Sequence, residues 1–211
     1  MVVKQAIPGK AFDVDQQLSG SEAAAFVKAG YLSVGRYIPR TPALAKGNLT
    51  ALEIEVLLTA GLSIFCVQHV AEDNWMPSAA LGTQYGQYGA TYAKAIGLPA
   101  GVSIFLDLEM VNTGATVEQI TDYCNEWFNE IQLEGYTAGL YVGWQTGLSS
   151  QQLYDLPFKS YWRGYNADIA VATRGYQILQ APAKNLNGIS FDPNEIWTDK
   201  LGGLPILLYP S

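Results

Sequence analysis

Two carboxylates at the end of one strand-like segment are the residues of this chain whose types and spacing most clearly suggest chemistry. Side chains alternate along 103–109, so Asp107 and Glu109 share one face with Phe105, while the opposite face is apolar throughout. Acids are costly to bury at the end of a hydrophobic strand unless they serve a purpose. Paired carboxylates suit glycosidic cleavage, in which one acid protonates the leaving oxygen and another activates water or stabilises the oxocarbenium ion. A structural acid pair, satisfied by arginine or by backbone amides, is the alternative.

Further polar and aromatic side chains lie near the ends of other strand-like segments. Asp13 lies in the first segment and Asp192 in the last, where it precedes Pro193 and could instead shape a turn. Tyr141 and Trp162 are aromatic, and such rings stack on the apolar faces of sugars while their polar edges form hydrogen bonds. The candidate catalytic residues are Glu109, Asp107 and Asp13, and the candidate substrate-binding residues are Tyr141, Trp162, Asp192, Gln180 and His69.

These residues must be positioned by strands and helices that alternate along the whole chain. Ser19 with Glu22, and Thr50 with Glu53, have the spacing of helix capping boxes. The pattern predicts helices over 19–29, 50–60, 77–96, 116–134 and 149–154. It predicts strands over 11–15, 31–38, 62–70, 102–109, 136–143, 159–165, 176–181 and 188–192, followed by an apolar segment over 205–209.

The order of these elements indicates the fold. Strands separated by helices imply a parallel sheet joined by right-handed crossovers. Eight strand-like segments predict an α/β fold, a compact (β/α)8 TIM barrel with reduced helices in its second half, as a single domain over 1–211. An open doubly wound sheet is the second interpretation. We interpret Gly82 and Gly86 as helix positions where small residues permit close packing.

Composition narrows the classes of partner and cofactor. With 49% hydrophobic residues, 15% charged residues and a net charge of −7, the chain is a poor partner for nucleic acid or an anionic membrane. A single histidine excludes a multi-histidine metal site, and no nucleotide-binding motif is present, so we expect neither metal nor cofactor. Cys66 and Cys124 lie far apart and suit two buried thiols, with a disulfide as the alternative.

No segment of the sequence has the properties of a membrane span or of a signal peptide. Apolar runs stay well short of the roughly 18 residues that a spanning helix needs, and the first residues lack the apolar core of a signal peptide. The sequence therefore leaves open a cytoplasmic location and export by a non-standard route, such as phage lysis or effector secretion.

Several short motifs, taken in order, resemble one family. They are Phe12-Asp13-Val14-Asp15, the segment 30–37, Asp107-Leu108-Glu109, and the segments 161–165 and 191–194. Over about residues 9–195 the sequence resembles a glycoside-hydrolase-like TIM-barrel family, formerly a domain of unknown function, that is distantly similar to family 25 lysozymes. The resemblance implies a site at the strand C-termini, with Glu109 as proton donor, Asp107 as its partner, and Asp13 and Asp192 as acids of the first and last strands.

We therefore expect a glycoside hydrolase that acts on peptidoglycan or a related amino-sugar polymer. Glu109 would be the general acid, its pKa raised by burial and by the nearby Asp107, while Asp107 or Asp13 would orient water or support a substrate acetamido group. Tyr141 and Trp162 would line the sugar subsite. The alternative is a non-catalytic glycan-binding barrel module that keeps the cleft without turnover.

Overall fold

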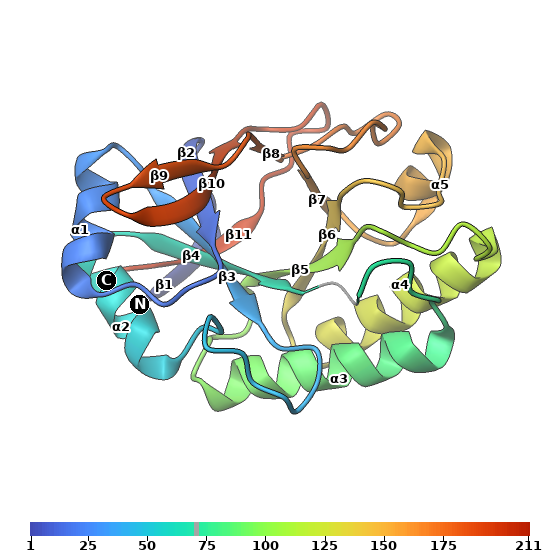
Figure 1. The fold of residues 1–211 in the computed structure, drawn as a ribbon, viewed down its shortest axis with the longest axis horizontal. Coiled ribbons are helices and arrows are strands. Elements are labelled where there is room, and N and C mark those ends of the chain that lie inside the picture. The colour runs from blue at the N-terminus through green and yellow to red at the C-terminus, as the bar shows by residue number, and fades with distance from the viewer. Residues whose placement is uncertain (70–71) are drawn as a thin grey trace.

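Eight strands close into a barrel within the residues that the computed structural model describes, 1–69 and 72–211 (Figure 1). Each strand pairs with the next along the chain, and the last pairs with the first. The predicted TIM-like barrel is therefore confirmed, and the alternative of an open sheet is wrong. The barrel strands are β2 (Gly9–Val14), β3 (Ser33–Ile38), β4 (Ser63–Gln68), β5 (Ser103–Leu108), β6 (Thr137–Val142), β7 (Ser160–Arg163), β8 (Ile178–Gln180) and β10 (Ile189–Ile196).

The last barrel strand runs against its neighbours, which corrects the expected all-parallel sheet. β10 is antiparallel to both β2 and β8, whereas the pairs from β2 round to β8 are parallel. The chain between β8 and β10 forms the short strand β9 (Lys184–Leu186), which makes a hairpin with β10. A parallel return needs a crossover of roughly a dozen residues or more. The connection from β8 to β10 is too short for such a crossover, so β10 runs antiparallel to its neighbours.

Helices cover the first half of the barrel more fully than the second (Figure 1). α1 (Gly20–Lys28), α2 (Ala51–Ala60), α3 (Ala79–Ala95) and α4 (Val117–Leu133) follow β2 to β5 in turn, and the short α5 (Ser150–Asp155) follows β6. In the described part of the chain no helix follows β7 or β8. The predicted reduction of the helices in the second half is therefore confirmed.

Local sequence signals account for how these helices begin and pack. Ser19 caps α1, and the Glu22 carboxylate accepts a bond of 2.6 Å from the Ser19 backbone N–H, which confirms that capping box. Thr50 caps α2 by accepting from the backbone N–H of Glu53, but the Glu53 carboxylate turns elsewhere, so the second box is only half formed. Gly82 of α3 lies against the α4 backbone, as the expected close packing requires.

Two further strands close the bottom of the barrel. β1 (Val2–Gln5) pairs antiparallel with β11 (Ile206–Tyr209), and β11 pairs with the start of β4. The predicted apolar segment 205–209 is thus a strand, and its Leu207 is buried in the barrel interior. The Ser103 hydroxyl accepts a bond of 2.9 Å from the Ile206 N–H and so joins this lid to β5. The chain ends meet, since the Met1 amino group donates to the Ser211 hydroxyl at 2.8 Å.

Aromatic rings fill the middle of the barrel. Phe65, Phe105 and Trp162 pack edge to face, with ring centroids 5.3–5.9 Å apart. Glycine makes room for them, because a Cβ at Gly139 would lie 2.5 Å from the Phe105 ring. A barrel plugged at this level places any site above the plug, at the mouth.

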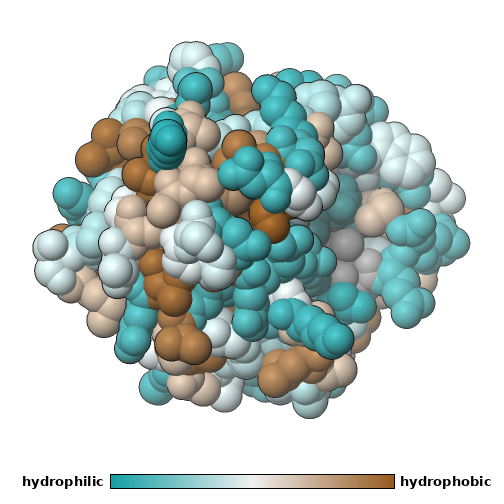
Figure 2. Space-filling model, turned by 60° about the vertical axis from the view of Figure 1, so that its left-hand side comes forward, coloured by the Kyte–Doolittle hydropathy of each residue, from teal (hydrophilic) through white to brown (hydrophobic). Residues whose placement is uncertain are grey.

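On the face drawn in Figure 2, hydrophobic residues lie in separate groups between hydrophilic ones. Among the described residues, no helix is long and apolar enough to cross a membrane.

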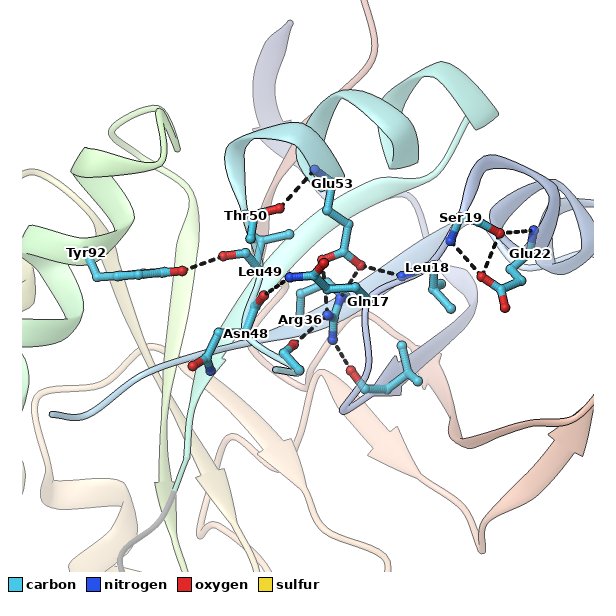
Figure 3. Close-up of polar contacts among 12 residues, drawn as sticks. Gln17, Leu18, Ser19, Glu22, Arg36, Asn48, Leu49, Thr50, Glu53 and Tyr92 are labelled. Atoms are coloured by element: carbon cyan, nitrogen blue, oxygen red, sulfur yellow. Dashed lines mark hydrogen bonds and ion pairs between the residues drawn. The ribbon is translucent and has the colours of Figure 1, made fainter. Parts of the chain in front are cut away.

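A buried ion pair joins the loops that follow β2 and β3 (Figure 3). The Arg36 and Glu53 side chains are 0% and 3% exposed, and Arg36 Nε lies 3.0 Å from Glu53 Oε1. Arg36 also donates to the carbonyls of Val14 and Gly47, while Glu53 accepts from the Leu18 N–H at 2.9 Å. Both charges therefore have several partners, as buried charges require. The first candidate acid, Asp13, lies next to Val14.

Replacing Glu53 by alanine should destabilise the protein by about 3–5 kcal/mol, because Arg36 would be left as an uncompensated buried charge. Glu55, which is exposed on the same helix, provides the matched control, and Glu55→Ala should change stability by less than about 0.5 kcal/mol. Denaturant unfolding followed by tryptophan fluorescence measures both variants. Equal losses in the two variants would contradict the structural role of the ion pair.

Candidate active site

Strand alternation brings polar side chains to the mouth of the barrel. Ala11, Phe105 and Ile178 belong to the buried interior, and the next inward positions along the same strands are Asp13, Asp107 and Gln180. Each of these polar residues therefore lies one layer above the apolar plug. The expected gathering of strand-end residues follows directly from the barrel geometry.

Asp13 is the centre of a hydrogen-bond network. Its side chain is buried, with 1% exposed, and accepts from the Tyr37 hydroxyl at 3.0 Å. Gln180 Nε2 donates to it at 3.0 Å and Asn194 Nδ2 at 2.7 Å. Burial raises the pKa of Asp13 to about 7, the charge of Asp192 adds to this increase, and the three donated bonds oppose it. At neutral pH this carboxyl group is therefore about half protonated.

Asp192 faces Asp13 from the neighbouring strand. The two residues are direct partners in the β10–β2 pair, so two like charges lie opposite each other. Burial also raises the pKa of Asp192. Both line a pocket of about 280 Å³, together with Tyr37 and Ser190. Such a pocket admits one small polar group of a ligand.

Gln180 and Asn194 extend the network across the mouth. The Gln180 Oε1 atom accepts from the Tyr141 hydroxyl and from the Tyr165 N–H, both at 3.0 Å. The Asn194 Oδ1 atom accepts from the Trp162 indole N–H at 2.8 Å. These amides fix the orientation of Asp13, because each donates to it with one end while its other end is held by a neighbouring donor.

Tyr141 lies where the candidate acids converge. Its side chain is 9% exposed, and burial raises the pKa of its phenol. Four carboxylates raise it further by repelling the phenolate. The structure thus brings together, around one phenol, the acids of the first, fourth and last predicted strands: Asp107, Glu109, Asp13 and Asp192.

Glu109 occupies the edge of this group. It is half-buried, and burial raises the pKa of its carboxyl group. The backbone N–H of Trp144 binds this carboxylate and opposes the increase, whereas the charge of Asp73 adds to it. Asp73, in the loop after β4, is thus one neighbouring charge that acts on Glu109, and the expected effect of Asp107 stays a prediction. The Trp75 indole donates to the Glu109 carbonyl at 2.9 Å and fixes the backbone there.

Two glycines at strand ends make space for the site. A Cβ at Gly143 would lie 2.5 Å from the Glu109 Cβ, and a Cβ at Gly164 would lie 2.5 Å from the Tyr141 hydroxyl. Neither glycine has a positive φ, so close approach is the constraint rather than backbone conformation. Larger residues at these positions would displace Glu109 or Tyr141.

Trp162 and His69 occupy different positions from the other candidates. Trp162 is 1% exposed and lies beneath the mouth, where its indole donates to Asn194 and packs edge to face against Tyr141, with ring centroids 5.0 Å apart. His69 stacks on Tyr37, with ring centroids 4.1 Å apart, and bonds to Asp15 at 3.3 Å. Burial lowers the pKa of His69, so it is neutral at pH 7.

Several residues of the site were not assigned a role from the sequence. Tyr37 could have been found, because it shares the inward face of its strand with Gly35. Asn194 lies beyond the predicted end of the last strand, at residue 192. Asp73 lies in a loop and carries no pattern that marks it.

Metal and thiol chemistry have no visible basis in the described residues. Among them, no group of three or more His, Cys, Asp or Glu side chains is arranged to hold a metal ion. Cys66 and Cys124 are both free and buried, as expected, and burial raises the pKa of the Cys66 thiol to about 12.

The facing acids predict an unusual dependence of stability on pH. In the unfolded chain Asp13 loses its proton near pH 4, whereas in the folded protein its pKa is about 7. Between these values the folded state holds the extra proton, so Asp13 makes stability fall as pH rises, by about 1.4 kcal/mol per pH unit. Removing the charge of Asp192 lowers the pKa of Asp13, so Asp192→Asn should be more stable than wild type at pH 8 but not at pH 4.

Urea unfolding at several pH values measures this difference. The exposed Asp168 provides a control, because Asp168→Asn removes one charge far from the pair in sequence and leaves Asp13 unchanged. A stability difference between Asp192→Asn and wild type that is constant with pH would refute the coupling of the two acids.

The sequence and the fold are both similar to those of known proteins. A model of the family described as Rv2525c-like, glycoside hydrolase-like domain matches residues 24–198. A search of curated proteins found no match. The Tat-secreted protein Rv2525c of Mycobacterium tuberculosis has a similar structure, with a TM-score of 0.69, 20% identity, and coverage of 92% of this chain and 98% of that chain. An uncharacterized B. stearothermophilus protein gives a TM-score of 0.70 at 15% identity, over 89% of this chain and 95% of the other.

A modular autolysin has a related barrel. LytC from Streptococcus pneumoniae, in complex with a synthetic peptidoglycan ligand, gives a TM-score of 0.62 at 13% identity, over 90% of this chain and 47% of the LytC chain. At these identities the likeness shows the fold alone. The family model spans most of the sequence, which confirms the resemblance found in its motifs. The chain therefore belongs to the Rv2525c-like family of glycoside hydrolase-like domains.

Proposed function

We propose that this domain hydrolyses glycosidic bonds in peptidoglycan or a related amino-sugar polymer, with Glu109 as the general acid. The observation that carries the proposal is the environment of the Glu109 carboxyl group, which is half-buried at the barrel mouth with a raised pKa. A general acid must hold a proton near the working pH and release it to the leaving oxygen. Three further acids lie around the neighbouring Tyr141.

Asp107 and Asp13 take different parts in this proposal. Asp107 shares the inward face of β5 and precedes Glu109 by two residues, so it is the partner that orients water or stabilises the oxocarbenium ion. Asp13 is held rigidly by three donors, and we assign it to the N–H of a substrate acetamido group. Asp192 lines the same pocket and excludes anionic groups from it.

Exposed aromatic rings at the mouth provide the sugar-stacking surface. Trp144 is 49% exposed, and its backbone N–H binds Glu109, so this residue lies next to the acid. Tyr165 is 59% exposed and lies next to Gln180, to which its N–H donates. Rings of this kind bind the apolar faces of sugars. Tyr141 and His69 contribute polar edges, whereas Trp162 acts from below by positioning Asn194.

The related barrels support the choice of substrate. LytC is an autolysin whose structure holds a synthetic peptidoglycan ligand, and the phage Cp-1 endolysin gives a TM-score of 0.55 at 15% identity. Both are named as enzymes that lyse cell walls. From these proteins we infer the class of polymer on which this domain acts, a cell-wall glycan, but not the linkage that it cleaves.

A non-catalytic glycan-binding module is the second candidate function. One observation favours it: Asp13 is buried and already accepts three hydrogen bonds within the protein. An acid satisfied in this way cannot activate water for turnover unless a neighbour gives up a bond. This function predicts saturable glycan binding without products.

Replacing Glu109 by glutamine should abolish turnover, because the amide keeps the shape of the side chain but has no acidic proton to donate. We expect a loss of at least about 100-fold in the release of reducing ends from peptidoglycan or chito-oligosaccharides. Glu118→Gln, at an exposed position of α4, is the control and should retain full activity. Equal activity of Glu109→Gln and wild type would refute Glu109 as the general acid, whereas no activity of wild type on either glycan while binding persists would favour the binding module.

Replacing Asp73 by asparagine should shift the pH profile. The Asp73 charge raises the pKa of Glu109, so its removal lowers that pKa and the alkaline limb of kcat/KM moves to lower pH. Asp73 is exposed, so the shift should be clearest at low ionic strength and should shrink as salt is added. The adjacent exposed Glu72 gives the control variant Glu72→Gln. A profile that moves equally in both variants would remove the specific role of Asp73.

A further inference from the structure

A second groove lies on the outside of the barrel, where no helix covers the wall in the described residues. It has a volume of about 370 Å³ and lies between β8, β10 and the segment that leads into β3. In Figure 1 this side carries the β9–β10 hairpin in place of a helix. The residues that give the groove its chemistry are Lys10, Tyr31, Leu179, Lys184, Glu195 and Trp197.

The outward-facing side chains of the groove lie on the other face of the strand layer from the candidate acids. On β8, Gln180 faces the barrel interior, so its neighbour Leu179 faces outward. On β10, Asn194 bonds to Asp13 inside the barrel, and Glu195 therefore faces outward. None of the four acids at the mouth lines the groove, although Gln180 and Asn194, which donate to Asp13, border it.

The groove combines a flat aromatic surface with positive charge. Trp197 is 49% exposed, and Tyr31 is held by edge contacts with the buried rings of Phe12 and Phe26. Neither Lys10 nor Lys184 forms an ion pair within the described parts of the chain. With the single acid Glu195 the groove has a net positive charge, in a chain whose net charge is −7.

We propose that this groove binds a carboxylate-bearing saccharide, as an outer subsite for the same wall polymer. The sugar stacks on the Trp197 indole while its carboxylate lies between the two lysines. The choice of a wall glycan rests on the proposed function of the mouth. Charge complementarity selects the carboxylate: Glu195, the cross-strand partner of Lys10, offsets only one of the two lysine charges, and a neutral sugar makes no use of the positive charge that remains.

The test uses the full chain with Glu109→Gln, so that ligand is not consumed. The probes are a muramic-acid disaccharide with a free carboxylate and neutral chitotetraose, and the readouts are calorimetric affinity and the NMR shift of the Trp197 indole N–H. Lys10→Gln/Lys184→Gln should weaken binding of the carboxylate probe about tenfold, close to 1.4 kcal/mol, and leave chitotetraose binding unchanged. Lys28→Gln/Lys159→Gln, at exposed positions, removes the same charge elsewhere and should alter neither affinity.

Several results would overturn the outer subsite. These are unchanged affinity for the carboxylate probe in the lysine variant, equal weakening for both probes, or an indole signal that does not move. Hydrolysis of chitotetraose by the wild-type protein is measured in parallel. Absence of hydrolysis with intact groove binding refutes the proposed function alone, whereas normal hydrolysis without groove binding refutes the subsite alone.

Discussion

The buried pair of Arg36 and Glu53 is the interaction on which the mouth of the barrel depends. Its two charges hold the segment after β2 and the segment before α2 through carbonyl and amide groups. Isolated buried charges are unstable, so the pair forces these loops into one arrangement. Asp13 precedes the first of the anchored carbonyls, and its orientation therefore depends on an ion pair that faces away from the site.

Inside the barrel, polar groups are concentrated in a single layer above an aromatic plug. Asp13 and Asp192 lie opposite each other, and the structure tolerates this repulsion because amides and a phenol hold one of the acids in place. Acids with raised pKa values gathered around Tyr141 cost stability, and sites of function are where proteins accept such a cost. In the same arrangement, burial is the largest influence on the pKa of Asp13 and raises it, while the three hydrogen bonds lower it by less.

The barrel and its main acids were predictable from the sequence because alternation and capping are local. The pattern from Ser103 to Glu109 defined both faces of β5, and Ser19 with Glu22 defined the start of α1. The direction of β10 was not predictable in the same way, because it depends on the short return through β9. Asp73 was missed because its role arises from loop placement, which leaves no local signal. Asn194 lies in the motif 191–194, but its bond to Asp13 arises from cross-strand register, which the motif does not show.

The bonds that complete Asp13 come from very distant parts of the chain. Gln180 and Asn194 follow it by 167 and 181 residues. During synthesis Asp13 leaves the ribosome early, whereas Gln180 and Asn194 are made near the end. The first strand therefore lacks these two partners until the barrel can close. Long sequence separation of this kind slows folding. Burial of the first acid is therefore coupled to the final closure of the barrel, and a chain interrupted before β8 contains all five helices of the described residues but no assembled site.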